Sequence, residues 1–249
     1  MNTTQPLVSS IVTGASRGIG AAIARRLAAQ GHAVAVNYAG READARSVVQ
    51  AIEAEGGRAF AVRADVADPA QVREMFEAVM ARHGRIDVVV NNAGVMVPGL
   101  PTVATMSDAD FDRTLAVNFK GAFNVMREAA LRIADGGRIV NLSSSVVGVA
   151  FAGYGAYAGT KAAVETMTSI LAKELRGRRI TVNAVAPGPT STEMFLEGKS
   201  DEAVARLAQA APLERLGEPE DIASVVAFLV GPDGGWVNGQ TLRANGGMV

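Results

Sequence analysis

The sequence predicts an α/β fold in which a mostly parallel sheet is covered by helices on both faces. Short apolar runs rich in β-branched residues alternate with segments of helical periodicity along the chain. The runs have no polar face, as expected for strands that are buried on both sides. A glycine-rich turn directly follows the first run, at the point where such folds join a strand to a helix.

Each apolar run is predicted to form a strand, and a helical pattern or a loop follows it. The predicted strands cover residues 7–13, 33–38, 58–65, 86–92, 137–144 and 180–187. The predicted helices cover residues 20–31, 41–55, 69–83, 107–133, 156–176 and 217–230. Gly31 is placed to end the first helix, and Pro219 is placed in the first turn of the last.

The length and composition favour one domain over residues 1–249. The 249 residues are 49% apolar, which suits one large buried core, and no linker, repeat or low-complexity segment divides the chain. The connection over 188–212 is unusually long for a loop in such a domain. Loops of this length are often functional, so we expect a substrate lid there.

Charge and composition exclude several classes of function. The formal net charge is −1 and the 24 basic residues are spread along the chain, so we expect neither a nucleic-acid partner nor a membrane partner. The absence of cysteine excludes disulfides, thiolate nucleophiles and cysteine-ligated metals. The start of the chain has no signal-peptide pattern, and a cytoplasmic location is predicted. His32 and His83 follow helices in polar contexts, and no metal site is predicted.

The turn TGASRGIG, residues 13–20, has the composition of a phosphate-binding turn. Gly14, Gly18 and Gly20 allow a tight turn, a close approach of the backbone to a pyrophosphate, and close packing of helix on strand. A phosphate-loop NTPase would end the turn in Gly-Lys-Ser/Thr, which is absent. The strand, turn and helix in that order therefore predict a dinucleotide site.

These features resemble the short-chain dehydrogenase/reductase family. The glycine spacing, NNAG at 91–94, Asn118, a serine thirteen residues before a tyrosine, YAGTK at 157–161 and PG at 187–188 occur in the family's order along nearly the whole chain. Within the family, the sequence looks most like the 3-oxoacyl-carrier-protein reductases. The resemblance implies a Rossmann-type, doubly wound domain with a seven-stranded sheet. It also implies an oxidoreductase that transfers a hydride between a dinucleotide and a ketone or secondary alcohol, for example a 3-oxoacyl thioester.

The resemblance assigns catalytic roles to Tyr157, Lys161 and Asn118. Tyr157 is expected to donate a proton to the carbonyl oxygen, and it shares a helix face with Lys161, four residues away. Lys161 is expected to lower the phenol pKa of about 10 by roughly 1 to 3 units and to hold the nicotinamide ribose. Asn118 is expected to hold a water that links Lys161 to solvent. A buried amide that satisfies free backbone groups is an alternative reading of Asn118 and is compatible with the first.

Three consecutive serines precede Tyr157, and the family spacing selects Ser144 as the fourth catalytic residue. Its hydroxyl is expected to hydrogen-bond the substrate oxygen. Side chains alternate along a strand, so Ser143 and Ser145 are expected to face elsewhere.

The cofactor contacts implied by the resemblance come from the loops at the predicted strand ends. Asn91 and Gly94 are expected beside the adenosine and ribose, whereas Thr190 and Thr192 either contact the carboxamide or a phosphate or only solvate their loop. The full set is Gly14, Ser16, Arg17, Gly18, Ile19, Gly20, Asn37, Arg41, Asp65, Val66, Asn91, Ala93, Gly94, Tyr157, Lys161, Pro187, Gly188, Thr190 and Thr192.

The predicted cofactor is NADP(H) in preference to NAD(H). An NAD-binding chain has an acid at the end of the second strand, which accepts from the ribose 2′-hydroxyl. The corresponding residues here, 37–39, are Asn, Tyr and Ala. Arg17 and Arg41 could instead reach a 2′-phosphate. The alternative is that neither arginine contacts the cofactor: Arg17 is then exposed to solvent, and Arg41 begins a helix.

Two other classes of function compete with a reductase of a small-molecule carbonyl compound. A regulatory protein that only binds the dinucleotide would need neither the phenol nor the serine, and a sugar-nucleotide epimerase would need a longer C-terminal domain. Met96, Val97, Phe151 and Tyr154 predict a largely apolar substrate pocket.

A homotetramer is predicted, partly from the family resemblance. Relatives of this size pair the equivalents of the helices predicted at 107–133 and 156–176. In this chain Ala129, Ala163 and Met167 are expected on the outward faces of those helices, where a monomer would leave them partly exposed.

Overall fold

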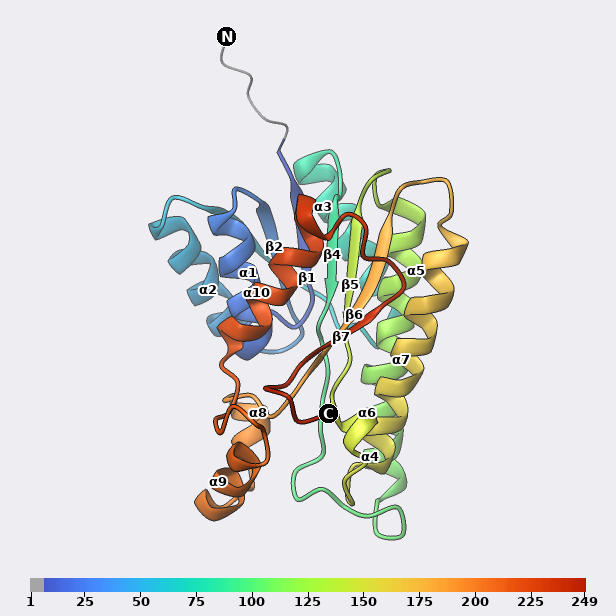
Figure 1. The fold of residues 1–249 in the computed structure, drawn as a ribbon. Helices are drawn as coiled ribbons and strands as arrows, with labels where there is room; N and C mark the ends of the chain where they lie inside the picture. The colour runs from blue at the N-terminus through green and yellow to red at the C-terminus, as the bar shows by residue number, and fades with distance from the viewer. Residues whose placement is uncertain (1–6) are drawn as a thin grey trace.

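Seven parallel strands form one sheet in the computed structural model, which describes residues 7–249 (Figure 1). The strand order is β3-β2-β1-β4-β5-β6-β7, and every neighbouring pair is parallel. The strands are β1 (Ser9–Val12), β2 (Ala33–Tyr38), β3 (Arg58–Arg63), β4 (Val88–Asn91), β5 (Arg138–Leu142), β6 (Thr181–Pro187) and β7 (Thr241–Ala244). The predicted α/β fold is confirmed, and the sheet is wholly rather than mostly parallel.

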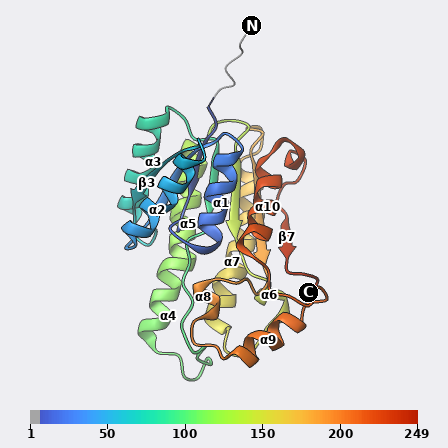
Figure 2. The ribbon, with the colours of Figure 1, turned by 90° about the vertical axis from the view of Figure 1, so that its left-hand side faces the viewer.

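Helices cover both faces of this sheet (Figures 1 and 2). Helices α1, α2 and α10 pack on one face, and α3, α5 and α7 pack on the other. The helices are α1 (Gly18–Ala29), α2 (Glu42–Ala54), α3 (Pro69–His83), α4 (Asp108–Thr114), α5 (Ala122–Arg132), α6 (Val146–Val149), α7 (Gly155–Glu174), α8 (Glu193–Leu196), α9 (Asp201–Gln209) and α10 (Pro219–Val230). As predicted, Gly31 follows the end of α1 with a φ of 90°, and Pro219 begins α10.

The two helical layers explain why the strands carry apolar residues on both faces. Val12 and Val36 point into the core beneath α1, α2 and α10, whereas Ile11 and Ala35 point into the core beneath α3, α5 and α7. All four side chains are fully buried. A polar residue on either face of these strands would lose its hydration, so the alternation typical of a half-exposed strand is absent.

The strand order reverses direction between β1 and β4. From β1 the chain builds outward to β2 and β3, then crosses back to β4 and continues to β7. Ligands of open parallel sheets bind outside the carboxyl ends of the strands at such a reversal. Helices α4, α6, α8 and α9 all lie beyond this edge of the sheet (Figures 1 and 2).

The single helix predicted over 107–133 is interrupted. Helix α4 ends at Thr114, a π-helical segment η1 (Leu115–Gly121) follows, and α5 begins at Ala122. Side-chain periodicity does not reveal such a wide turn, because the apolar pattern continues across it. Asn118, a poor helix former, lies within this segment and is fully buried.

The long connection over 188–212 carries helices α8 and α9. Each begins with a side-chain cap: the Thr192 hydroxyl accepts from the Phe195 N–H, and the Ser200 hydroxyl accepts from the Ala203 N–H. The segment is therefore structured and lies below the carboxyl edge of the sheet in Figure 2.

The N-terminal residues that entered the prediction of location include 1–6, which lie outside the described residues. Across residues 7–249, none of the helices combines the length and the apolar character needed to cross a bilayer. The cytoplasmic location stays a prediction from the sequence.

The turn between β1 and α1 packs directly against the loop that follows β4. Gly14 has a φ of 61°, and a Cβ atom there would lie 2.8 Å from the Cα atom of Ala93. A Cβ atom at Gly20 would lie 2.5 Å from Nδ2 of Asn92. Glycine is therefore required at both positions by the packing of the protein itself, in addition to any approach of a ligand.

Replacement of Gly14 by alanine should lower the free energy of unfolding more than the same change at Gly84. Both have positive φ, but no atom lies within 4 Å of a Cβ at Gly84, so Gly84→Ala measures the backbone cost alone. That cost is about 1 to 2 kcal/mol, and the clash with Ala93 should add about 1 to 3 kcal/mol. Urea denaturation of both variants measures the difference. Equal losses would show that the β4 loop yields to the added methyl group.

Candidate active site

A cavity of about 420 Å³ lies at the carboxyl edge of the sheet, between the loops that follow β1, β2, β4, β5 and β6. Helices α7 and α8 close its remaining sides. The predicted cofactor residues that line it are Gly14, Ser16, Arg17, Gly18, Ile19, Gly20, Asn37, Arg41, Asp65, Val66, Ala93, Gly94, Tyr157, Lys161, Pro187, Gly188, Thr190 and Thr192. Segments that are far apart in the sequence thus converge on one pocket.

Tyr157 and Lys161 lie on the face of α7 that lines this pocket. The Lys161 side chain is buried, and its Nζ donates a hydrogen bond of 2.7 Å to the carbonyl oxygen of Leu142 at the end of β5. The same Nζ lies 5.7 Å from the centre of the Tyr157 ring. The hydrogen bond to Leu142 therefore links α7 to the end of β5, close to Tyr157.

The three serines after β5 have different environments, as the alternation of side chains predicted. The Ser143 hydroxyl donates to Glu165 Oε1 at 2.6 Å, and the Ser145 hydroxyl donates to the Ala186 carbonyl at 2.9 Å. The Ser144 hydroxyl is half-buried and lines the cavity with Tyr157. Ser144 is therefore the serine whose hydroxyl is accessible to a ligand.

Asn118 stands behind the cavity. Its side chain makes two hydrogen bonds of 2.8 Å with Val95, accepting from the backbone N–H and donating to the carbonyl. A Cβ atom at Gly94 would lie 3.4 Å from Asn118 Oδ1 and 3.6 Å from Lys161 Nζ, so the two side chains meet at Gly94. The alternative reading of Asn118, a buried amide bound to free backbone groups, thus describes its contacts.

The glycine-rich turn is held by buried polar side chains. The Thr13 hydroxyl accepts from the N–H groups of Asn92 and Ala93, and Asn92 Nδ2 donates to the carbonyl of Thr13 at 2.8 Å. Asn37 Oδ1 accepts from the Gly14 N–H at 3.1 Å, while its Nδ2 group donates to β3 and the residues after it. Asn37 lines the cavity, but its amide is already used to position the turn.

Arg17 and Arg41 lie at the edge of the cavity that is formed by the turn and the end of β2. Neither is simply solvated, because both guanidinium groups pair with the carboxylate of Glu193 in α8. Arg41 also lies 3.4 Å from Asp44 Oδ2. The two arginines are therefore close enough together to share one anion.

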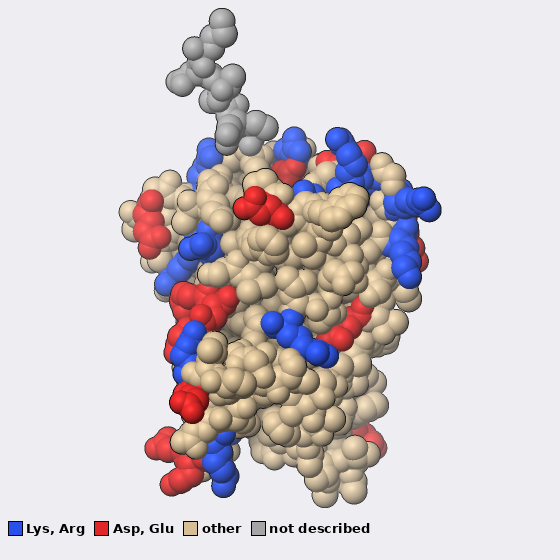
Figure 3. Space-filling view, viewed as in Figure 1, with Lys and Arg blue, Asp and Glu red and all other residues tan. Residues whose placement is uncertain are grey.

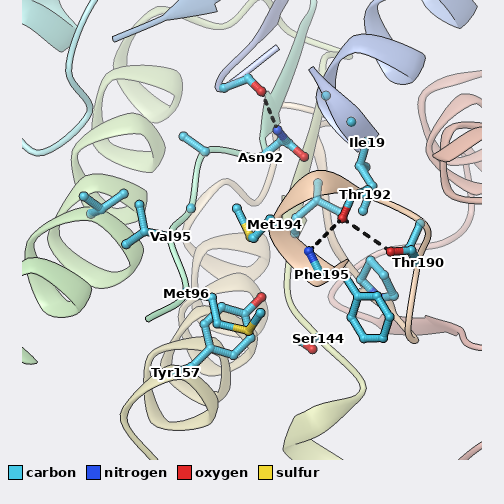
Figure 4. Close-up of a pocket in the computed structure, with 18 of the residues that line it drawn as sticks. Ile19, Asn92, Val95, Met96, Ser144, Tyr157, Thr190, Thr192, Met194 and Phe195 are labelled. Atoms are coloured by element: carbon cyan, nitrogen blue, oxygen red, sulfur yellow. Dashed lines mark hydrogen bonds between the residues drawn. The ribbon is translucent and has the colours of Figure 1, made fainter. Parts of the chain in front are cut away.

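The opposite end of the cavity is apolar. Figure 4 shows Tyr157, Ser144 and Met96 at this end and Ile19 and Asn92 at the other. Met96, Phe151 and Tyr154 line the cavity as predicted, whereas Val97 does not. Leu207 of α9 and Met248, near the end of the chain, line it as well.

Comparison with known proteins agrees with this geometry. The family model described as enoyl-(acyl carrier protein) reductase matches residues 14–249. A short-chain type dehydrogenase/reductase of Picea abies is 49% identical over 248 residues, covering 96% of this chain and 92% of the relative. The chain belongs to the short-chain dehydrogenase/reductase family. It is accordingly an oxidoreductase.

Two further relatives and one solved structure are similar to this chain over nearly its whole length. A chloroplastic NADPH-dependent aldehyde reductase-like protein of Arabidopsis thaliana is 48% identical over 252 residues, covering 96% of this chain and 93% of the relative. A 3-oxoacyl-[acyl-carrier-protein] reductase of Staphylococcus aureus is 43% identical over 242 residues, covering 96% of this chain and 97% of the relative. A short-chain dehydrogenase of Burkholderia cenocepacia in complex with NADP is 41% identical, with a TM-score of 0.91 and 99% of each chain covered.

Asn91 is the predicted cofactor residue that lies away from the cavity of this short-chain dehydrogenase/reductase. Its Nδ2 group donates to Asn141 Oδ1 at 3.1 Å and to the Ala122 carbonyl at 3.0 Å. Asn91 is the last residue of β4, and its side chain points towards α5, whereas Asn92 follows the strand and turns towards Gly14. Because two asparagines stand side by side in the sequence, the motif alone does not show that Asn92 and not Asn91 lines the cavity.

The hydroxyls of Thr190 and Thr192 are used within their own loop. Thr190 donates to the Gly188 carbonyl at 2.9 Å, and Thr192 donates to the Thr190 carbonyl at 3.3 Å while capping α8 (Figure 4). Both residues line the cavity. In the protein alone their hydroxyls therefore hold the loop together, and their expected contacts to the carboxamide or to a phosphate stay a prediction.

Neither histidine lies in this site. His32 Nδ1 shares a hydrogen bond of 2.7 Å with the Ser10 hydroxyl, and His83 Nδ1 shares one of 2.8 Å with the Ser9 hydroxyl. Both contacts are with β1, away from its carboxyl end. Among residues 7–249, no cluster of three or more His, Cys, Asp or Glu side chains is arranged to bind a metal ion.

Burial controls the protonation of the two α7 side chains. Burial raises the pKa of Tyr157 to about 12, although hydrogen bonding with Ser144 acts in the opposite direction. Burial lowers the pKa of Lys161 to about 8. Lys161 is not among the causes of the shift at Tyr157, so the lowering of the phenol pKa that was expected from Lys161 is absent in the protein alone, where loss of hydration dominates.

The depressed pKa of Lys161 predicts a dependence of stability on pH. Its folded-state pKa of about 8 lies below the ordinary 10.5, so between these values the folded chain binds fewer protons than the unfolded chain. Stability from this group therefore rises with pH across that window, and is lowest below it, where a buried ammonium must be kept charged. From about pH 7.5 to about pH 10, the wild type should gain about 1 to 3 kcal/mol of unfolding free energy relative to Lys161→Met.

Urea denaturation of the wild type and of Lys161→Met at the two pH values measures this gain. The difference between the two proteins isolates Lys161 from other groups that titrate. A difference that stays constant would show that Lys161 titrates at its ordinary pKa.

Proposed function

We propose that the protein is an NADP(H)-dependent reductase or dehydrogenase that interconverts a small carbonyl compound and its alcohol. The observation that carries this proposal is the convergence of Tyr157 and Ser144 on one cavity, with the Lys161 ammonium group directly behind them. A protein that only bound a dinucleotide would have no use for a proton donor and a hydroxyl at the apolar end of its pocket. The family relationship supports the same reading.

The cavity has the features that a dinucleotide requires. The β1–α1 turn has no side chain at Gly14, Gly18 or Gly20, and all three line the cavity, so a pyrophosphate can approach the backbone at the start of α1. Two arginines lie at one end, and the proton donor lies at the other. NADP(H), when bound, supplies or accepts the hydride.

Tyr157 donates its phenolic proton to the carbonyl oxygen as the carbonyl carbon receives the hydride, so that the C=O group becomes CH–OH. A pKa of about 12 keeps this proton in place throughout the neutral range. Ser144 donates a hydrogen bond to the same oxygen and favours the negative charge that develops on it. Lys161 holds the ribose and, together with Asn118, connects Tyr157 to the proton supply from solvent.

The preference for NADP(H) rests on charge at the end of β2. No acid is present at Asn37, Tyr38 or Ala39, so the usual acceptor for a ribose 2′-hydroxyl is missing there. Arg17 and Arg41 supply two guanidinium groups that can bind a 2′-phosphate. The names of the Arabidopsis thaliana relative and of the Burkholderia cenocepacia structure, which mention NADPH and NADP, support this choice.

The substrate is a ketone or aldehyde with an apolar substituent, for which a 3-oxoacyl thioester is one candidate. Met96 and Phe151 form part of the substrate end, and Met194, Phe195 and Leu207 from the 188–212 segment complete it. This segment acts as the substrate lid. The presence of both an aldehyde reductase and a 3-oxoacyl reductase among the relatives supports a carbonyl substrate.

Removal of the Tyr157 hydroxyl should abolish turnover and leave cofactor binding intact. Tyr157→Phe keeps the ring but removes the proton donor, so kcat for carbonyl reduction should fall by at least about 10²- to 10⁴-fold. Turnover is measured as the rate of NADPH oxidation with a panel of apolar ketones, aldehydes and an acyl thioester. NADPH binding by calorimetry is the control for folding. A variant with near wild-type kcat would refute the role of Tyr157.

The protein assembles as a homotetramer, and two exposed apolar regions support this. On the α5 and α7 side, Phe123, Leu131 and Ile170 are 47%, 68% and 50% exposed. Ala129, which was expected on the same surface, is fully buried against the core and contributes nothing to it. On the other side, Trp236 is 98% exposed. Figure 3 shows a largely uncharged surface over α10, with a basic and an acidic group near the centre of the view.

Light scattering should give a mass about four times the 25.7 kDa of the chain. Phe123→Glu introduces a charge into one apolar surface and should yield a dimer, because the second surface remains intact. Gln50→Glu, at an exposed position of α2, adds the same charge elsewhere and should stay tetrameric. A wild-type mass near 25.7 kDa would contradict the assembly.

The cytoplasm is the proposed location. The absence of cysteine is compatible with a reducing compartment and supports this proposal. Fractionation of the source cells, with enzyme activity as the marker, tests it.

A further inference from the structure

The carboxylate of Glu193 joins two arginines from different parts of the fold. Arg41 Nη2 lies 2.8 Å from Glu193 Oε1, and Arg17 Nη1 contacts Glu193 Oε2. Arg17 immediately precedes α1, Arg41 immediately precedes α2, and Glu193 is the first residue of α8. One lid residue thus holds both basic groups at the phosphate end of the cavity.

A carboxylate between two guanidinium groups has the same charge arrangement as a bound phosphate. Arginine recognises both anions through paired N–H donors in the plane of the guanidinium. Hydrogen bonding from Arg17, followed by the contacts of Arg41, lowers the pKa of Glu193, so this carboxylate is ionised at neutral pH. Asp44 does not play the same part, because it pairs with Arg41 alone and at 3.4 Å.

We propose that Glu193 competes with the 2′-phosphate of NADP(H) for Arg17 and Arg41, and that it is thereby a specificity-determining residue. This inference rests on the proposed use of NADP(H). Binding of the 2′-phosphate requires both arginines to release Glu193, and a phosphate with a charge of about −1.5 to −2 displaces a single carboxylate. A dinucleotide without that phosphate leaves the ion pairs in place.

Two nucleotides that differ only at the 2′ position isolate this competition. Adenosine 2′,5′-bisphosphate carries the 2′-phosphate, and adenosine 5′-monophosphate does not. Isothermal titration calorimetry of each nucleotide with wild type and Glu193→Gln needs neither nicotinamide nor turnover. Glutamine keeps the size of the side chain and removes its charge.

Glu193→Gln should bind adenosine 2′,5′-bisphosphate about 2- to 10-fold more tightly than the wild type. This range corresponds to the loss of two exposed ion pairs that the ligand no longer has to break. Binding of adenosine 5′-monophosphate should change by less than about twofold on the same basis. Glu197→Gln is the matched control, because Glu197 is exposed in the same segment and forms no salt bridge with residues 7–249. It should bind both nucleotides like the wild type.

Weaker binding of the bisphosphate by Glu193→Gln would overturn the inference, because Glu193 would then assist the phosphate site. Equal changes for both nucleotides would overturn it too, since they would indicate a structural role. Arg17→Ala and Arg41→Ala test the underlying cofactor assignment separately. If neither arginine variant weakens the bisphosphate more than the monophosphate, the NADP(H) assignment itself fails. If both do so and Glu193→Gln has no effect, only the role of Glu193 fails.

Discussion

A parallel sheet that is buried on both faces brings the carboxyl ends of all its strands to one edge, and the candidate active site follows from that constraint. Each strand must be followed by a crossover before the next can begin, so the loops after β1, β4 and β5 meet although they are far apart in the sequence. The close approach of Gly14 to Ala93 shows how tightly these loops are packed. A residue with a side chain at Gly14 would push the cofactor turn and the β4 loop apart.

At this edge of the sheet, a buried hydrogen bond joins Lys161 of α7 to the end of β5. Lys161 is removed from water and donates to the Leu142 carbonyl, which follows from the need to satisfy a buried ammonium group. Tyr157, one turn earlier on α7, lies beside Ser144, which follows β5. The same burial that lowers the pKa of Lys161 raises that of Tyr157, so in the protein alone both groups favour their neutral forms relative to water.

Residues whose positions follow from local periodicity could be predicted from the sequence. Strand alternation separates Ser144 from its neighbours, and helical spacing places Tyr157 beside Lys161. What the sequence could not show depends on contacts across the fold. Asn92 and not Asn91 reaches the cavity because the chain turns after β4, and Glu193 meets Arg17 only because α8 folds back over the first turn. The π-helical segment around Asn118 leaves no mark on the apolar pattern.

Helix α8 connects the phosphate end and the substrate end of the cavity, which were predicted from different segments of the sequence. Its first residue, Glu193, binds the arginines at the phosphate end, and the next two, Met194 and Phe195, line the cavity at the substrate end (Figure 4). The helix is only four residues long and is capped by Thr192, so a single helical turn carries the contacts at both ends. The phosphate end and the substrate end of the cavity therefore depend on the same short helix, and a substitution in α8 can affect both ends.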